Sequence, residues 1–439
     1  MLLYLIGVLV MVLGIAVSIA LHEIGHLLPA KAFRVRCTQY MVGFGSTLWS
    51  TRRGETEYGI KAVPLGGYVR MIGMFPPDKD GKVRASSSNP FHQMVEQARA
   101  DSLEEVGPDD HDRVFFRLPV WKRLIIMAGG PLMNLVLAGV LMGLVLTVHG
   151  VPTSITPTLS SVSACVNVDV EDTSCEGKPP SPALAAGLQA GDRILSVNGT
   201  EVSTWSEASY EIQNAGAQGL FVIERGGQQQ TLTADLVVRD RPVIGADGLV
   251  VLDEAEEPVY QEVSFLGASG SVLYERQPIA EVPGVVGEMF TRTAGIVLTL
   301  PVHLVNVANA AFGPDERDSE GPMSVVGVGR VAGDVSQSGL MPGDTAGDKL
   351  WWLVSLIASL NMALFVFNLI PLLPLDGGHI AGALWEGLKR TVARVFRRPD
   401  PGPVDTAKAL PVAYAVAIGL LAMSALLIYA DIVKPIQLT

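Results

Sequence analysis

Four long uncharged stretches stand out in the sequence, and they divide the chain into membrane-like and polar parts. The uncharged stretches are Met1 to Leu21, Leu124 to Val148, Leu350 to Leu375 and Ala409 to Ala430. A helix of about 20 apolar residues is long enough to cross the hydrocarbon core of a bilayer. The pattern therefore predicts four transmembrane helices, within the segments 1–30, 122–150, 350–380 and 409–431.

The polar segments between these stretches carry different patterns. In 31–121, β-branched and aromatic runs broken by glycine and proline favour a membrane-associated β region from Cys37 to Val69, followed by a flexible loop with a short helix near 90–100. In 151–282, strands are expected at 193–197, 219–224 and 231–238. Segment 283–349 is expected to hold an amphipathic helix followed by a linker. Segment 381–408 is expected to be a basic loop.

The distribution of charge predicts how the chain is oriented in the membrane. Segments 31–123 and 377–408 carry 15 and 6 Lys/Arg against 11 and 3 Asp/Glu, whereas segment 151–349 carries 10 against 27. Loops rich in Lys and Arg near helix ends stay in the cytoplasm. We therefore expect 31–123 and 377–408 on the cytoplasmic side and 151–349 on the opposite side. The net charge of −12 argues against a nucleic-acid partner.

The three cysteines divide between the two predicted sides. Cys37 falls in the cytoplasmic part, where we expect a free thiol. Cys165 and Cys175 fall on the opposite, oxidising side and are ten residues apart in a polar loop. They are candidates for a small disulfide, with two unrelated thiols as the alternative.

The end of the first uncharged stretch carries a candidate metal site. Residues His22-Glu23-Ile24-Gly25-His26 have the pattern H-E-x-x-H. On a helix, histidines four residues apart lie on one face and can bind one zinc ion, with the glutamate beside the first able to act as base. The pattern also occurs by chance. Ionisable residues at membrane depth are costly, however, so their presence here favours metal binding by His22 and His26 with Glu23 as catalytic base.

A catalytic zinc site needs a third protein ligand. Asp376 ends the third predicted membrane helix, after two prolines and before Gly377-Gly378. The predicted topology brings it to the cytoplasmic side, at the depth of His22 and His26. We therefore predict Asp376 as the third ligand; His379 is a rival ligand, and a helix-capping role for Asp376 is the structural alternative.

Two asparagines of the third predicted helix are candidates for substrate contact. Asn361 and Asn368 are seven residues apart and share a helix face. They could hydrogen-bond a substrate strand or a developing oxyanion. Hydrogen bonding between membrane helices is the alternative for both.

These residues together resemble the site-2 protease family of intramembrane metalloproteases, in its bacterial branch. The resemblance covers most of the chain. The motifs that carry it are His22–His26, Leu375-Asp376-Gly377, Asn368-Leu369-Ile370-Pro371, Gly43-Phe44-Gly45 and Gly130-Pro131-x-x-Asn134. The family often has a proline after the Gly-Phe-Gly segment, where this chain has Ser46.

The resemblance implies a polytopic α-helical membrane protein with a cytoplasmic-side β region and a single extracytoplasmic PDZ-like domain, in a bacterial inner membrane. It implies a Zn²⁺-dependent endopeptidase that cleaves single-pass membrane proteins, such as anti-sigma factors and remnant signal peptides, inside the bilayer. It also makes Gly43, Phe44 and Gly45 candidate substrate-binding residues. Two alternatives are a membrane-anchored zinc protease that cuts non-membrane sites, and a PDZ-based scaffold with a structural metal.

Overall fold

The structure, a computed structural model, describes residues 1–77, 90–104, 106–166, 175–242, 259–314, 317–318, 321–337 and 345–436. The chain forms two compact units. Unit 1 comprises residues 1–145, 278–337 and 351–439, and unit 2 comprises residues 146–277 and 338–350. Part of the predicted flexible loop, at 78–89, lies outside the described residues.

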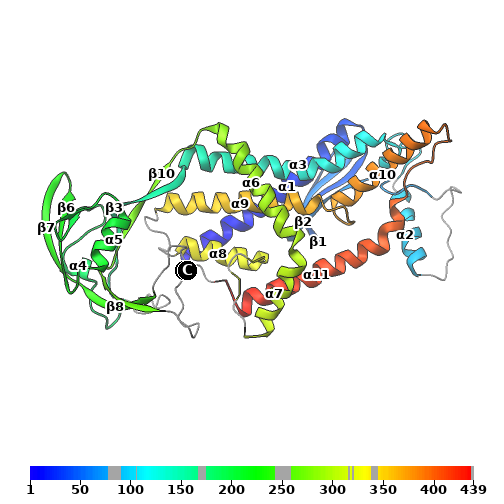
Figure 1. The fold of residues 1–439 in the computed structure, drawn as a ribbon. Helices are drawn as coiled ribbons and strands as arrows, with labels where there is room; N and C mark the ends of the chain where they lie inside the picture. The colour runs from blue at the N-terminus through cyan, green and yellow to red at the C-terminus, as the bar shows by residue number, and fades with distance from the viewer. Residues whose placement is uncertain are drawn as a thin grey trace. The chain divides into compact units, whose positions relative to one another are not determined.

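Unit 1 is mainly helical, and α1, α3 and α9 run side by side within it (Figure 1). Its helices are α1 (Leu2–Ala32), α2 (Pro90–Glu104), α3 (Val120–Leu144), α6 (Val282–Leu298), α7 (Leu300–Phe312), α8 (Val325–Gln337), α9 (Ala346–Asn368), α10 (Asp376–Val395) and α11 (Leu410–Val433). A π-helical turn, Val145–His149, follows α3, and 3-10 turns cover Phe115–Arg117, Ile279–Glu281 and Thr406–Ala409.

Four helical segments are long and apolar enough to cross a membrane, which confirms the four stretches predicted from charge. Among the described residues they are Leu2–Ala32, Val120–His149, Ala346–Asn368 and Thr406–Val433. Helices α6 and α7 pass the same test as a pair, but they meet at an angle of 65°. The single amphipathic helix expected in this region is therefore two helices with a break at Thr299.

The structure corrects two predicted connections. The basic segment 381–408 is not a loop throughout, because α10 continues to Val395. The segment after Phe312 is not only a linker, because α8 occupies Val325–Gln337. Charge in the first case and three helix-weakening glycines in the second hide these helices from a composition-based prediction.

Close packing on α1 explains why the glycine-rich α8 is helical. A Cβ atom on Gly7 of α1 would lie 2.4 Å from the carbonyl oxygen of Ala332, and one on Gly333 of α8 would lie 2.4 Å from the ring of Tyr4. Small residues let the two backbones approach where a side chain would hold them apart. Tertiary packing therefore outweighs the low helix propensity of this segment.

The predicted β region consists of two long antiparallel strands, β1 (Cys37–Arg53) and β2 (Thr56–Met71). They are joined by a turn at Gly54, whose φ of +63° suits glycine. Residues 39–42 of β1 have partners on both sides, in 57–60 and in 67–70, so the strands fold back on each other. Cys37 is a buried free thiol, and burial raises its pKa to about 11, which keeps it protonated at neutral pH.

Unit 2 is rich in β-structure. One sheet has the strand order β10-β3-β4-β6-β7 with β5 added on β4, and β8 pairs with β9. The strands are β3 (Val151–Val162), β4 (Arg193–Val197), β5 (Thr200–Glu201), β6 (Gln218–Arg225), β7 (Gln228–Asp235), β8 (Val237–Pro242), β9 (Tyr260–Phe265) and β10 (Ala268–Glu275), and the helices are α4 (Pro182–Ala185) and α5 (Trp205–Gln213). Its core contains Leu159, Ile194, Phe221 and Ile223, each at most 1% exposed.

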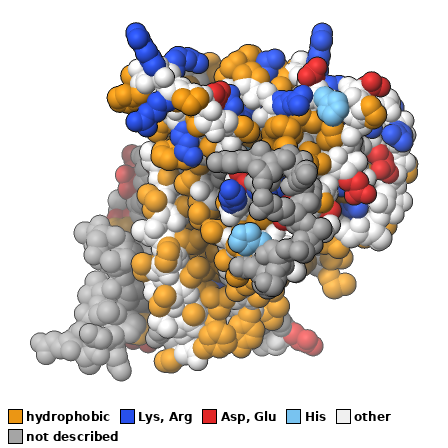
Figure 2. Space-filling view, turned by 90° about the vertical axis from the view of Figure 1, so that its right-hand side faces the viewer, with side chains coloured by type: hydrophobic (Ala, Val, Ile, Leu, Met, Phe, Trp, Pro, Cys, Tyr) orange, Lys and Arg blue, Asp and Glu red, His pale blue; other side chains and the backbone are white. Residues whose placement is uncertain are grey.

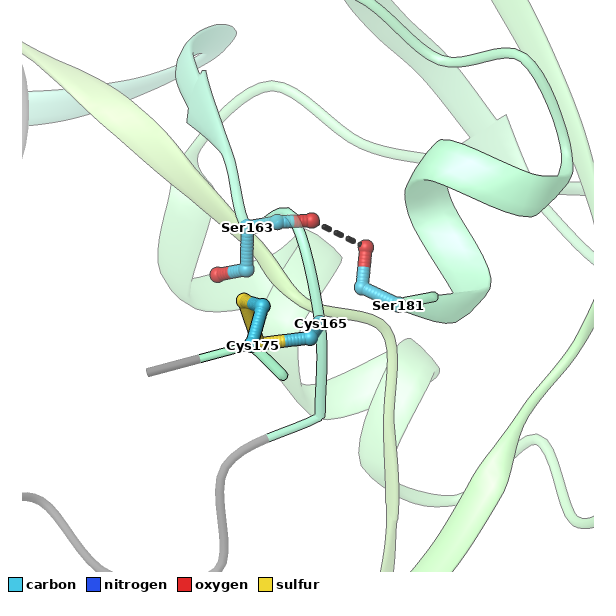
Figure 3. Close-up of a disulfide and its surroundings, with 4 residues drawn as sticks. All are labelled: Ser163, Cys165, Cys175 and Ser181. Carbon is cyan, nitrogen blue, oxygen red and sulfur yellow. Dashed lines mark hydrogen bonds between the residues drawn. A yellow bond between two sulfur atoms is a disulfide. The ribbon is translucent and has the colours of Figure 1, made fainter. Parts of the chain in front are cut away.

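A disulfide joins Cys165 and Cys175 at the start of unit 2 (Figure 3). Next to it, the Ser181 hydroxyl donates a hydrogen bond to the carbonyl oxygen of Ser163, and Cys165 forms an isolated β-bridge with Pro180. The bond closes a loop with a sequence separation of 10 residues. The disulfide, the β-bridge and the Ser181 hydrogen bond together join the segment from Ser163 to Cys165 to the segment leading into α4.

We expect Cys165→Ser to lower the free energy of unfolding of unit 2 by about 2–3 kcal/mol, because closing a loop of roughly ten residues removes that much chain entropy from the unfolded state. Urea unfolding of the purified protein measures the change, with limited proteolysis used to detect the unfolding of unit 2. Cys37→Ala, in unit 1, serves as control and should leave the transition of unit 2 in place. An unchanged transition in Cys165→Ser would contradict the expected role of the bond.

Candidate metal centre

The histidines of the H-E-x-x-H sequence lie in the last turns of α1 and face one carboxylate from a distant part of the chain. Nε2 of His22 and Nε2 of His26 are 3.2 Å apart. Each is 3.3 Å from Oδ2 of Asp376. His26 is buried and the other two side chains are largely so. This is the one group of potential metal-binding side chains found among the described residues.

A break after α9 brings Asp376 to the two imidazoles. Helix α9 ends at Asn368, and α10 begins at Asp376 itself. The first turn of α10 packs directly on the connecting segment: a Cβ atom on Gly377 would lie 2.2 Å from the carbonyl oxygen of Ile370, and one on Gly378 would lie 2.5 Å from the amide nitrogen of Leu373. Only glycine fits these two positions, so the Asp-Gly-Gly sequence permits the tight restart of the helix.

The spacing of the three donor atoms fits a zinc ion. Tetrahedral coordination with bonds of about 2.0–2.1 Å separates neighbouring ligand atoms by about 3.3 Å. The observed separations are 3.2–3.3 Å. Oδ2 of Asp376 is buried and accepts no hydrogen bond within the described part of the chain. A cation between the three atoms would satisfy this oxygen, and three protein ligands would leave the fourth position open for a reactant.

A backbone contact sets the protonation pattern of one imidazole. Nδ1 of His26 is 2.8 Å from the carbonyl oxygen of Ile126 in α3. A carbonyl oxygen only accepts, so Nδ1 carries a hydrogen and donates it. In the neutral ring Nε2 is then left with a lone pair, directed at His22 and Asp376. Such an outer hydrogen bond is the usual support of a metal-binding histidine.

Glycines allow α1 and α3 to approach closely at this point. A Cβ atom on Gly25 would lie 2.3 Å from the carbonyl oxygen of Gly129, and one on Gly129 would lie 2.1 Å from that of Gly25. A Cβ atom on Gly130 would lie 2.1 Å from Nε2 of His26 and 2.7 Å from Nε2 of His22. The absence of a side chain at position 130 therefore leaves the room that the donor atoms occupy.

A buried ion pair holds α10 against α3. Nη2 of Arg123 lies 2.5 Å from Oε1 of Glu386, and the backbone N–H of Val404 donates a hydrogen bond to Oε2 of the same carboxylate at 2.9 Å. Glu386 is fully buried and also pairs with Arg390 at 3.0 Å. Since Asp376 begins α10, this pair helps to set the position of the third donor relative to the two histidines.

The carboxylate of Glu23 lies between the histidines in sequence and is buried beside the β region. It is 8% exposed. A Cβ atom on Gly67 of β2 would lie 2.8 Å from Cγ of Glu23, so the strand backbone packs on this side chain. The Tyr40 hydroxyl of β1 donates to the carbonyl oxygen of Ala20 at 2.8 Å, which fastens the β region to α1.

The other predicted site residues lie outside the donor group, each in a different environment. Asn361 is fully buried and donates to the Ser18 hydroxyl of α1 at 2.9 Å, which is the interhelical role rather than the predicted substrate contact. Asn368 is half-buried at the end of α9. His379 lines a small cavity with Phe115 and Arg123 and is not part of the donor group.

The Gly-Phe-Gly segment lies in β1, where the strand bends. Gly43 and Gly45 have φ values of +96° and +85°, in the region that favours glycine. Phe44 is 48% exposed and stacks on the ring of Tyr68. The segment therefore presents an exposed aromatic side chain at its surface.

Sequence reasoning did not assign the part played by α3. Ile126, Gly130 and Asn134 are spaced by four residues, so they lie on one face of that helix. Ile126 and Gly130 contact His26 as described, and the Asn134 amide lies 3.0 Å from Nδ1 of His22. The signal was present in the i, i+4 spacing of Gly130 and Asn134, but nothing in the sequence alone directed that face toward the histidines.

The fold and the site together define a membrane metalloprotease, and comparison with known proteins agrees. A model of Peptidase family M50 matches residues 10–397. The chain is 32% identical over 437 residues to the zinc metalloprotease Rip1 of Mycobacterium tuberculosis, and the match covers 98% of each protein. It is 31% identical over 448 residues to Rip1 of Mycolicibacterium smegmatis, covering 99% of this chain and 98% of the other. The metalloprotease MmpA of Caulobacter vibrioides is 26% identical over 406 residues, covering 89% of each.

The chain therefore belongs to Peptidase family M50, the site-2 protease family. It is a zinc-dependent metalloprotease and an integral membrane protein. The resemblance predicted from the motifs is confirmed, as are the enzyme class and Zn²⁺ as cofactor.

We expect Gly130→Ala to abolish stoichiometric zinc binding while the helices remain folded, because the added methyl group would occupy the space beside both Nε2 atoms. Gly139→Ala is the matched control on the same helix, since its Cβ atom would meet nothing closer than Val286 at 4.0 Å. Zinc content by metal analysis and helix content by circular dichroism test the pair. Full zinc content in Gly130→Ala would show that the donors do not converge at this position.

Proposed function

We propose that this protein is an intramembrane protease that hydrolyses peptide bonds within the transmembrane segments of single-pass membrane proteins. The observation that carries the proposal is the location of the donor group. Two of its side chains and the glutamate beside them belong to a helix apolar enough to span a membrane. Ionisable side chains at membrane depth are rare and mark functional sites.

In this proposal His22, His26 and Asp376 hold the zinc ion, and Glu23 is the general base. The bound ion supplies a Lewis acid that polarises the scissile carbonyl and makes water more acidic. Glu23 takes a proton from the attacking water and returns it to the leaving amine. Its burial beside Gly67 keeps bulk water away from the carboxylate, and Asn368 is a candidate hydrogen-bond partner for the substrate backbone.

The β region offers a strand edge with which an unwound substrate segment would pair. A transmembrane helix hides its amides in its own hydrogen bonds, so the protease must bind it in extended form. Residues 67–70 of β2 pair with 39–42 on one side, and no other described strand pairs with their second side. Gly67 at the start of this edge contacts Glu23, which supports addition of a substrate strand along 67–70. Gly43, Phe44 and Gly45 border the same region.

The proposed orientation puts the zinc site near the cytoplasmic side and unit 2 outside the cytoplasm. The Lys/Arg distribution supports it, and so does the disulfide in unit 2, which is typical of an oxidising compartment. In this proposal unit 2, with its sheet and short helices, is the PDZ-like domain. In a bacterial inner membrane such a domain would select substrates, with anti-sigma factors and remnant signal peptides as the expected classes.

Helix α10 supports the same orientation. Its exposed apolar residues recur at helical spacing, and the exposed charged residues from Leu384 to Arg398 are cations, which is typical of a helix lying at a membrane surface. The apolar set is Leu384, Trp385, Leu388, Val392 and Val395, and the cationic set is Lys389, Arg394, Arg397 and Arg398. Figure 2 shows the right-hand side of the Figure 1 view. Many Lys and Arg side chains lie toward its top, and hydrophobic side chains cover much of the surface below them.

We expect Glu23→Gln to lose cleavage by at least about 100-fold, because removal of the general base alone accounts for that factor, while zinc is retained. The experiment co-expresses wild type or Glu23→Gln with candidate single-pass membrane proteins and maps the new fragment by mass spectrometry. A cut inside the transmembrane segment supports the proposal. A cut in a loop outside the membrane identifies the alternative protease, and cleavage that persists in Glu23→Gln rules out the assigned base.

We expect Tyr68→Pro to impair cleavage while zinc content stays at the wild-type level, because proline cannot donate a hydrogen bond along a strand edge and disturbs its geometry. Tyr68→Phe is the matched control, since it keeps both the ring that stacks on Phe44 and the backbone N–H. Cleavage of an identified substrate and metal analysis are measured on the same preparations. Equal cleavage by the two variants would argue against strand addition at this edge.

A further inference from the structure

The side-chain amide of Asn134 contacts the candidate metal centre through one of its two polar atoms. Its side chain is completely buried in α3, between helices that span the membrane. Nδ2 of Asn134 is 3.0 Å from Nδ1 of His22, while Oδ1 has no hydrogen-bond partner among the described residues. A buried amide oxygen without a donor is costly, so this arrangement calls for an explanation.

The two possible orientations of the amide have opposite consequences for His22. If Nδ2 donates to Nδ1 of His22, the neutral ring carries its hydrogen on Nε2. That hydrogen would point at Nε2 of His26 and Oδ2 of Asp376, 3.2 and 3.3 Å away, and a protonated nitrogen cannot bind a metal. If the amide is rotated by 180°, Oδ1 accepts the hydrogen of Nδ1 and Nε2 keeps its lone pair.

In the rotated orientation, one contact pairs Oδ1 of Asn134 and also leaves Nε2 of His22 free to bind zinc. It gives the orphaned Oδ1 a donor, and it directs the lone pair of Nε2 to the point where the other two donor atoms converge. It also makes the two histidines equivalent, because His26 already donates from Nδ1 to the carbonyl oxygen of Ile126. Both outer acceptors then belong to α3, two helical turns apart.

We propose that Asn134 is a positioning residue that accepts a hydrogen bond from Nδ1 of His22 through its side-chain oxygen and so fixes the tautomer that binds zinc. The proposal rests on the ligand role of His22 given above. It assigns to α3 a function beyond packing: one face of this helix sets the protonation and orientation of both imidazoles.

The test compares three substitutions by zinc affinity, measured by competition with a chelator on the purified full-length protein. Asn134→Leu removes the acceptor at similar volume and should weaken zinc binding by about 10-fold to 100-fold, the range for loss of an outer hydrogen bond to a metal-binding histidine. Asn134→Asp can only accept and should bind zinc at least as tightly as wild type. Asn361→Leu is the matched control, a second fully buried asparagine that contacts Ser18 instead, and should leave zinc affinity unchanged.

The absorption spectrum of the Co²⁺-substituted protein provides a second readout. It should change in Asn134→Leu and be restored in Asn134→Asp. Equal weakening in the Asp and Leu variants would mean that Asn134 acts as a donor or only as packing, which overturns the proposal. Wild-type affinity in Asn134→Leu would also overturn it. His22→Ala separates this failure from that of the proposed function: if it binds zinc normally, His22 is not a ligand at all.

Discussion

The close contact between α1 and α3 is the constraint on which the metal centre depends. Gly25 and Gly129 bring the two backbones together, and Gly130 leaves space beside both imidazoles. In a membrane, where burial of apolar surface gives helices little reason to associate, small residues of this kind permit the van der Waals contact that holds them. A larger residue at any of these positions would separate the histidines from the helix that orients them.

Helix α3 connects the two halves of the site. Toward α1 it offers the carbonyl oxygen of Ile126 and the amide of Asn134 to the two histidines. Toward α10 it offers Arg123 to the buried carboxylate of Glu386. A buried charge pair contributes little net stability, but removing one partner leaves a buried unpaired charge. The pair therefore acts mainly to fix the register of α10, whose first residue is Asp376.

The candidate metal site was predictable because its residues belong to short sequence patterns. The H-E-x-x-H pattern at the end of an apolar helix indicated two ligands and a base, and the Leu-Asp-Gly sequence after two prolines indicated a third donor at similar depth. The four membrane helices followed from the absence of charge over about 20 residues. The strand predicted at 193–197 matches β4, and the one predicted at 219–224 lies within β6. The strand predicted at 231–238 instead spans the end of β7 and the start of β8.

The predictions failed where packing against a distant element decides the structure. Helix α8 contains glycines that disfavour a helix in isolation, but close contact with other helices suits two of them: Gly333 packs against Tyr4 of α1 and Gly327 against Asp431 of α11. Asn361 and Asn134 are both buried asparagines of membrane helices, yet one contacts Ser18 and the other a histidine of the metal centre. The sequence by itself determined which residues could bind zinc and which segments enter the membrane, because residue type and local apolar length govern both. The tertiary structure alone decided which groups of α3 the two histidines contact, because contacts between residues 100 or more positions apart depend on how the helices meet.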